Sequence, residues 1–196
     1  ARFLKSKLIE FPALKPLLRF LKLFLHLRGL NEVFRGGLGS FSAACLMLSF
    51  LQIHPLVQLG YLRPEDNLGI LLMEFLELYG KHFNYERVGI TVGIDTESSN
   101  VKSNNSAGTT KFFGYYDKED LEFANESRPS LLSIQDPQCP SNDLARPSFA
   151  IASVRQAFEH AFGVLTAAAG ELDAAREAKE PWQRGRTDGS ILAGLI

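Results

Sequence analysis

Apolar residues recur along most of this chain at spacings of three and four, which is typical of helices that bury one face. The strongest case is residues 13–28, where leucine and phenylalanine fill most positions and Gly29 marks the end. Proline and glycine punctuate the rest of the chain. The pattern predicts four more helices, over residues 2–10, 41–54, 67–81 and 148–169.

Alternation at every second residue is confined to a short part of the chain. Ile90, Val92 and Ile94 alternate within residues 88–94 and predict a strand. Residues 95–128 are rich in serine, asparagine, glycine and acidic residues, which indicates a long variable loop with a weak strand over 110–116. We therefore expect a mainly α (α+β) fold with a small β element.

The 196 residues supply enough apolar material for one large domain, which we place at residues 1–169, followed by a tail at 170–196. The first residue is Ala1, within an apparent helical pattern, so we expect the chain to be part of a longer protein. The longest apolar runs are too short to span a bilayer, and we expect no membrane partner.

A positive stripe lies along the helix predicted over 13–28. Lys15, Arg19, Lys22 and His26 are spaced four, three and four apart, so a helix places them on one face. A glycine-rich loop follows at 35–41. A cationic stripe beside glycines and a helix N-terminus suits a polyphosphate, although a solvated face of an amphipathic helix would give the same pattern.

Two residues at the end of the glycine-rich loop add to this picture. Ser40 is expected as the N-cap of the next helix, offering its hydroxyl and free backbone N–H groups to an anion. Phe41 is either a core residue or a platform on which a base stacks.

Charge is unevenly distributed. Residues 1–35 hold eight Lys or Arg and two Asp or Glu, whereas the whole chain has a net charge of −1. This balance argues against a protein held to nucleic acid by bulk charge. The cluster at 117–120 is expected to be solvated.

No metal or catalytic motif stands out. Cys45 falls in an apolar run and is expected in the core, while Cys139 falls in a polar loop. No CxxC motif or His/Cys cluster indicates a metal. The residues by themselves form no convincing catalytic centre.

A proline-bracketed segment at 131–146 carries a dense group of polar side chains. It contains Gln135, Asp136, Asn142, Asp143 and Arg146. One interpretation is an Asx-rich connection whose side chains cap their own backbone. The other is a rim that reads a base edge, since an asparagine amide both donates and accepts hydrogen bonds, as adenine requires.

Three blocks together resemble a known family. Residues 12–42, 66–86 and 131–146 are similar to the central, PAP-associated domain of Trf/Cid-type non-canonical poly(A) polymerases, members of the DNA polymerase β-like nucleotidyltransferase superfamily. The resemblance extends over residues 2–167 and is strongest to the fungal nuclear enzyme of the TRAMP complex. It implies a helical central domain.

The resemblance implies roles for residues near the glycine-rich loop. Lys22 matches a lysine that contacts the triphosphate, and His26 stands where uridylyltransferase relatives carry a second lysine. Ser40 matches a phosphate-contacting serine. Phe41 matches the aromatic residue on which the incoming base stacks.

It also implies roles within 131–146. Residues 136–142, from Asp136 to Asn142, match the nucleotide recognition motif. Its base-reading position is histidine in uridylyl-transferring relatives and Asn142 here, which favours ATP as the substrate. Arg146 matches a basic residue that closes the motif.

The activity implied is that of an RNA-specific adenylyltransferase, which adds short oligo(A) tails to RNA 3′ ends for nuclear exosome surveillance. In the family, Mg²⁺ or Mn²⁺ is bound by three carboxylates of a separate catalytic domain, so this fragment is expected to be inactive alone. Expected partners are the RNA 3′ end and the zinc-knuckle RNA-binding protein and RNA helicase of a TRAMP-like complex, in the nucleus. Two alternatives remain: an RNA uridylyltransferase, and a non-catalytic interaction module.

Overall fold

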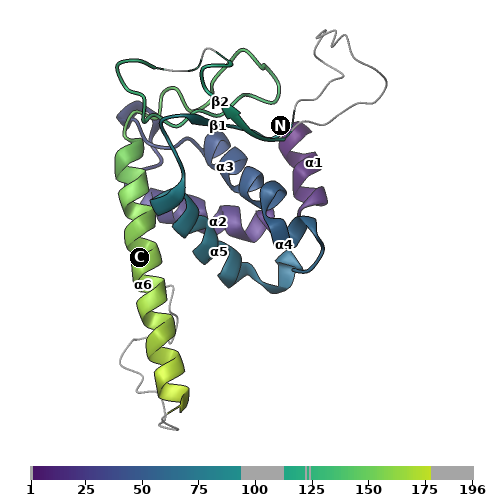
Figure 1. Cartoon of the computed structure of the whole chain (residues 1–196), viewed down its shortest axis with the longest axis vertical. Helices are drawn as coiled ribbons and strands as arrows, with labels where there is room; N and C mark the ends of the chain where they lie inside the picture. The colour runs from purple at the N-terminus through teal and green to yellow at the C-terminus, as the bar shows by residue number, and fades with distance from the viewer. Residues whose placement is uncertain (1, 94–112, 122, 124, 178–196) are drawn as a thin grey trace.

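The computed structural model describes residues 2–93, 113–121, 123 and 125–177 (Figure 1). Helices dominate this part of the chain, beside one two-stranded sheet. The α-helices are α1 (Arg2–Glu10), α2 (Leu14–Leu27), α3 (Ser40–Ile53), α4 (Pro55–Gln58), α5 (Leu68–Glu77) and α6 (Ile151–Glu177). Shorter turns of helix are η1 (Val33–Arg35), η2 (Pro64–Asp66) and η3 (Leu78–His82), the last of them a π-helix. The mainly α architecture predicted from the sequence is confirmed.

The predicted helices agree with the observed ones within one residue except in two cases, and the short helix α4 was not predicted. The helix expected over 148–169 begins at Ile151 and runs on to Glu177, because alanine and charged residues beyond 169 favour helix and outweigh the cost of the single Gly170. The helix expected over 67–81 changes at Leu78 into the π-helical turn η3.

Helix α3 is the centre of the core. All of its residues from Ser42 to Gln52 are buried, whereas α2 buries only the face opposite its basic stripe. Helices α2 and α5 contact α3, and α6 packs on α5 and η3 along one side of the molecule (Figure 1). Aromatic rings join these helices, since Phe75 of α5 contacts Phe50 of α3 and Phe158 of α6.

Strands β1 (Val88–Thr91) and β2 (Gly114–Asp117) pair antiparallel. The strand expected over 88–94 is therefore shorter, and that expected over 110–116 begins at Gly114, with residues 110–112 outside the described part. On its other side, β1 pairs with residues 133–135: the N–H of Ile90 donates to the carbonyl of Ser133, and the N–H of Gln135 donates to that of Ile90. The sheet thus leads directly into the segment that contains Asp136 and Asn142.

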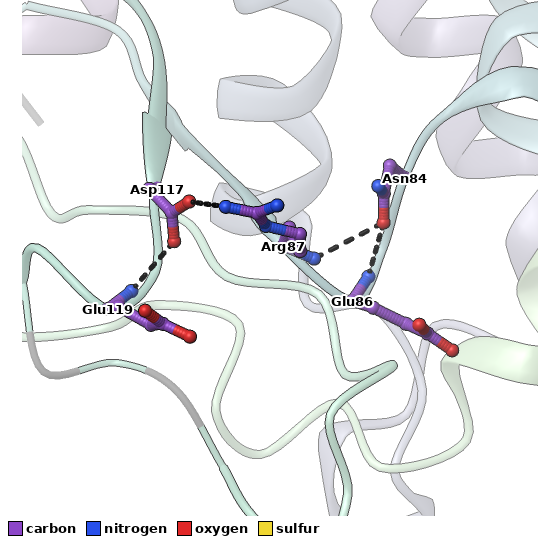
Figure 2. A network of polar contacts seen from close by, with 5 residues as sticks. All are labelled: Asn84, Glu86, Arg87, Asp117 and Glu119. Carbon is purple, nitrogen blue, oxygen red and sulfur yellow. Dashed lines mark hydrogen bonds and ion pairs between the residues drawn. The ribbon is translucent and has the colours of Figure 1, made fainter.

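A polar network closes one end of the strand pair (Figure 2). Arg87 Nη2 lies 2.8 Å from Asp117 Oδ2, and Asn84 Oδ1 accepts hydrogen bonds from the backbone N–H groups of Glu86 and Arg87. The backbone N–H of Glu119 donates a hydrogen bond to Asp117 Oδ1. This hydrogen bond and the one from Arg87 lower the pKa of the Asp117 carboxyl. The network fixes the chain on both sides of Lys118.

His54 joins α4 to α5. Its ring is 8% exposed, and Nδ1 accepts a hydrogen bond from the N–H of Val57 at the start of α4. The neutral ring therefore carries its proton on Nε2, which donates to Glu74 Oε2 at 2.7 Å.

Replacing His54 with alanine is expected to lower the free energy of unfolding by about 1–2 kcal/mol, because two partly buried hydrogen bonds are lost together. Urea unfolding followed by circular dichroism measures this change. His82→Ala is the matched control, since His82 is exposed and lies 3.7 Å from Glu77. The effect of His82→Ala should stay within about 0.5 kcal/mol. Equal losses in the two variants would contradict a stabilising role for the two hydrogen bonds of His54.

Candidate functional site

Residues 136–142, which we call the recognition loop, are closed on themselves by backbone hydrogen bonds. The N–H of Asp136 donates to the carbonyl of Asn142 at 3.0 Å, and Gln135 and Asp143 form an antiparallel bridge just outside. Inside the loop, Gln135 Nε2 donates to the carbonyl of Pro140. Two prolines stiffen the turn further. The loop is a compact hairpin-like structure.

Asp136 orients the side chain of Asn142. Asn142 Nδ2 lies 3.1 Å from Asp136 Oδ2, and Asp136 Oδ1 accepts a hydrogen bond from the N–H of Gln138. An ionised carboxylate only accepts hydrogen bonds, so the nitrogen of the Asn142 amide must face Asp136. Asn142 is exposed, and its Oδ1 remains as an acceptor for a ligand.

Asp143 secures the base of the recognition loop. Its Oδ1 accepts hydrogen bonds from the N–H groups of Ile134 and Ala145, each at 2.9 Å. Ile134 itself lies beside Ile90 of β1, so the loop is anchored on the sheet. The sequence pointed to Asp143 only as one member of a polar group.

Three hydrogen bonds tie the glycine-rich loop and the start of α3 to the chain that follows the recognition loop. Ser42 Oγ donates to the carbonyl of Leu144, and Ser148 Oγ donates to the carbonyl of Gly37. The N–H of Ala150 donates to the carbonyl of Gly36, whose φ of 78° and contact with the Phe149 ring both require glycine. Two segments about a hundred residues apart therefore meet at the start of α3.

Ser40 and Phe41 lie at this junction. Ser40 is exposed and is the first residue of α3, while Gly39 is the N-cap and no side chain caps this end. The expectation that Ser40 is the N-cap is thus wrong by one residue. The hydroxyl of Ser40 remains beside the open N-terminus of the helix. Phe41 is half-buried against the core, which leaves part of its ring accessible.

The basic stripe is exposed along α2, and the structure places Lys15, Arg19, Lys22 and His26 on that face. His26 Nδ1 lies 3.3 Å from Asn31 Nδ2. Within the described part of the chain, no hydrogen bond or ion pair joins Lys22 or His26 to the recognition loop. Helix α2 packs on α3, so the stripe and the junction occupy neighbouring elements.

A polar cavity of about 160 Å³ lies behind Asn142. Asn142, Asp143, Arg146, Lys118 and Arg128 are among the residues that line it. Arg146 is exposed at this cavity. The expectation that the cluster 117–120 is solvated is wrong for Lys118, which is 3% exposed. No local signal marks Lys118, because its contacts are distant in sequence.

The two cysteines differ as expected. Cys45 is buried, which raises the pKa of its thiol to about 12, and Cys139 is exposed on the recognition loop. Among the described residues, no group of three or more His, Cys, Asp or Glu side chains could hold a metal ion.

Comparison with known proteins identifies the family. Residues 67–142, which include α5, the sheet and the recognition loop, match the family described as Cid1 family poly A polymerase. The chain belongs to this family. Poly(A) RNA polymerase cid14 of Schizosaccharomyces pombe is 40% identical over 187 residues, which are 95% of this chain and 25% of that protein. Poly(A) RNA polymerase protein 1 of Eremothecium gossypii is 41% identical, over 89% of this chain and 26% of that protein.

A solved structure agrees with these relatives of the Cid1 family. The polymerase core of TRAMP, described as an RNA surveillance complex, superposes with a TM-score of 0.78 and 35% identity. The match covers all of this chain and 54% of that one. This Cid1-family chain therefore spans about a quarter of the length of its curated relatives and about half of the solved polymerase core. No helix in the described ranges is long and apolar enough to cross a membrane.

Proposed function

We propose that this chain is the nucleotide-recognition part of an RNA-specific adenylyltransferase that uses ATP. The observation that carries the proposal is the hydrogen bond between Asp136 and Asn142. It leaves Oδ1 of Asn142 as the acceptor presented to a base. The exocyclic amino group of adenine donates a hydrogen bond at the position where uracil has a carbonyl oxygen, which only accepts. This chemistry favours ATP over UTP.

The remaining site residues fit the other parts of a bound nucleotide. The open N-terminus of α3, with Ser40, suits a phosphate group. Phe41 offers a partly exposed ring for base stacking. Lys22 supplies positive charge from the neighbouring helix, and His26 lies on the same face. Arg146 is assigned to the polar cavity behind the base reader, where it supports the loop.

The wider role follows from the family and belongs to the longer protein. We propose that it adds short oligo(A) tails to RNA 3′ ends for nuclear exosome surveillance, together with a zinc-knuckle RNA-binding protein and an RNA helicase. The similarity to the polymerase core of TRAMP supports this proposal. We place the Mg²⁺ or Mn²⁺ ions and the chemical step outside this chain.

Replacing Asn142 with histidine in the longer protein tests the base-reading role. The kcat/KM for ATP relative to UTP is expected to fall about tenfold, because the amide oxygen that Asp136 orients towards the adenine amino group is removed. Incorporation of each nucleotide into an RNA oligonucleotide measures the ratio. Asn67→His is the matched control, since Asn67 only donates to the carbonyl of Arg63. An unchanged ratio in Asn142→His would defeat the assignment.

A further inference from the structure

A buried ammonium group lies behind the recognition loop. Lys118 directly follows β2, and its side chain points away from water, with 3% of the residue exposed. Its Nζ donates to the backbone carbonyl oxygens of Tyr85, Pro129 and Leu131, the second at 3.0 Å. An ammonium has three N–H donors, so all of them are used. Lys118 therefore joins three separate stretches of backbone.

Each of these stretches leads to the recognition loop or to its support. Tyr85 lies just before β1, and Leu131 begins the segment that pairs with β1 at Ile90. That segment continues through Ile134 into Asp136. Lys118 also lines the same cavity as Asn142. The ammonium is thus placed between the sheet and the residue that reads the base.

An apolar side chain at position 118 would leave these three carbonyl oxygens without their hydrogen-bond donor. The carbonyls of Pro129 and Leu131 are two residues apart on one stretch of chain and both point at Nζ. Without the ammonium, these partly buried acceptors would have to turn towards water, and the segment between them would move. Burial lowers the pKa of Lys118, whereas the charges of Asp143 and Glu86 act in the opposite direction.

We propose that Lys118 is a positioning residue that sets the place of Asn142 by fixing the chain that leads into the recognition loop. The proposal rests on the proposed function, because it takes Asn142 as the base reader. Lys118 itself has no free N–H donor for a nucleotide. Its influence on selectivity must therefore pass through the backbone.

The test uses the longer protein that carries this chain, with Lys118→Met, and steady-state kinetics with ATP and UTP below the melting temperature. We expect the KM for ATP to rise about tenfold, the ATP-to-UTP ratio of kcat/KM to fall, and kcat to change less than about threefold. Lys118→Arg keeps the charge and guards against misfolding. Its guanidinium spreads its N–H donors over a plane, whereas the ammonium of Lys118 directs all three from one nitrogen, so we expect a KM rise of about threefold.

Two controls separate positioning from general destabilisation. Val154→Ala leaves a cavity in the fully buried face of α6, and it should lower the melting temperature without changing the KM or the nucleotide ratio. Lys5→Met removes an exposed charge, and it should leave the melting temperature, the KM and the nucleotide ratio unchanged. Wild-type KM and ratio in both Lys118 variants would overturn the proposal, as would equal changes in Val154→Ala.

Asn142→His, measured in parallel, distinguishes this proposal from the proposed function. If Asn142→His shifts the preference and the Lys118 variants do not, only the role of Lys118 fails. If Asn142→His leaves the preference unchanged, the base reader fails, and Lys118 can no longer be assigned to positioning it.

Discussion

Replacing Gly80 with alanine is expected to lower the free energy of unfolding by about 2–3 kcal/mol. Gly80 lies in the π-helical turn η3 where it packs on α6. A Cβ at this position would lie 2.7 Å from the backbone nitrogen of Glu159 and 2.9 Å from its Cα. These are backbone atoms of a long helix, so the added carbon can be accommodated only if the two elements separate. Equilibrium urea unfolding measures the loss.

Gly163→Ala provides the matched control within α6. No atom lies within 4 Å of a Cβ built at Gly163, and its backbone is already helical. Alanine should therefore stabilise the protein by about 0.5–1 kcal/mol, through its higher helix propensity. Opposite signs for the two alanines are the expected result. Unchanged stability in Gly80→Ala would show that η3 does not depend on close backbone contact with α6. An equal loss in Gly163→Ala would show that the loss in Gly80→Ala is not specific to that contact.

Replacing Lys22 with alanine in the longer protein is expected to lower kcat/KM for ATP roughly 10- to 100-fold, the value of a charged contact with phosphate. Lys22 is exposed on α2 and free to reach a ligand. Steady-state kinetics at fixed ionic strength measures the loss. The melting temperature should be unchanged, because an exposed side chain contributes little to the fold.

Lys15→Ala is the control for Lys22, since Lys15 is exposed on the same stripe and has no assigned role. Its effect on kcat/KM should stay below about twofold. Equal losses in the two variants would mean that the stripe acts as a diffuse basic surface. A pull-down with the zinc-knuckle partner adds a second readout, and loss of the partner in Lys22→Ala would instead identify the stripe as a protein interface.

The sequence predicted those parts of the fold that depend on local periodicity. Helices α2, α3 and α5 could be predicted from the spacing of apolar residues, because residues three and four apart in the sequence share a helix face and show which faces are buried. The sequence predicts too early an end for α6, because Gly170 resembles a stop, whereas a single glycine costs a helix only about 1 kcal/mol and the residues after it favour helix. The π-helical turn could not be predicted, because it depends on how Gly80 meets a helix about eighty residues later.

The same distinction holds at the candidate site. The residue types of the recognition loop were apparent from its sequence, and the family resemblance supplied their proposed roles. The orientation of the Asn142 amide was not apparent, because it depends on which atom Asp136 contacts. Lys118 was misplaced on the surface, since its acceptors are backbone carbonyls that carry no side-chain signature.

The three hydrogen bonds between the glycine-rich loop and residues 144–150 have a consequence for the affinity of the pocket. They fix the backbone on both sides of Phe41 and the chain leading from Asn142 in one arrangement before any nucleotide arrives. Ordering of this backbone is thus completed during folding, and binding does not have to supply that conformational entropy again. Under the proposed function, the part of the site assigned to the base is preorganised, so tight binding does not require many contacts to the base.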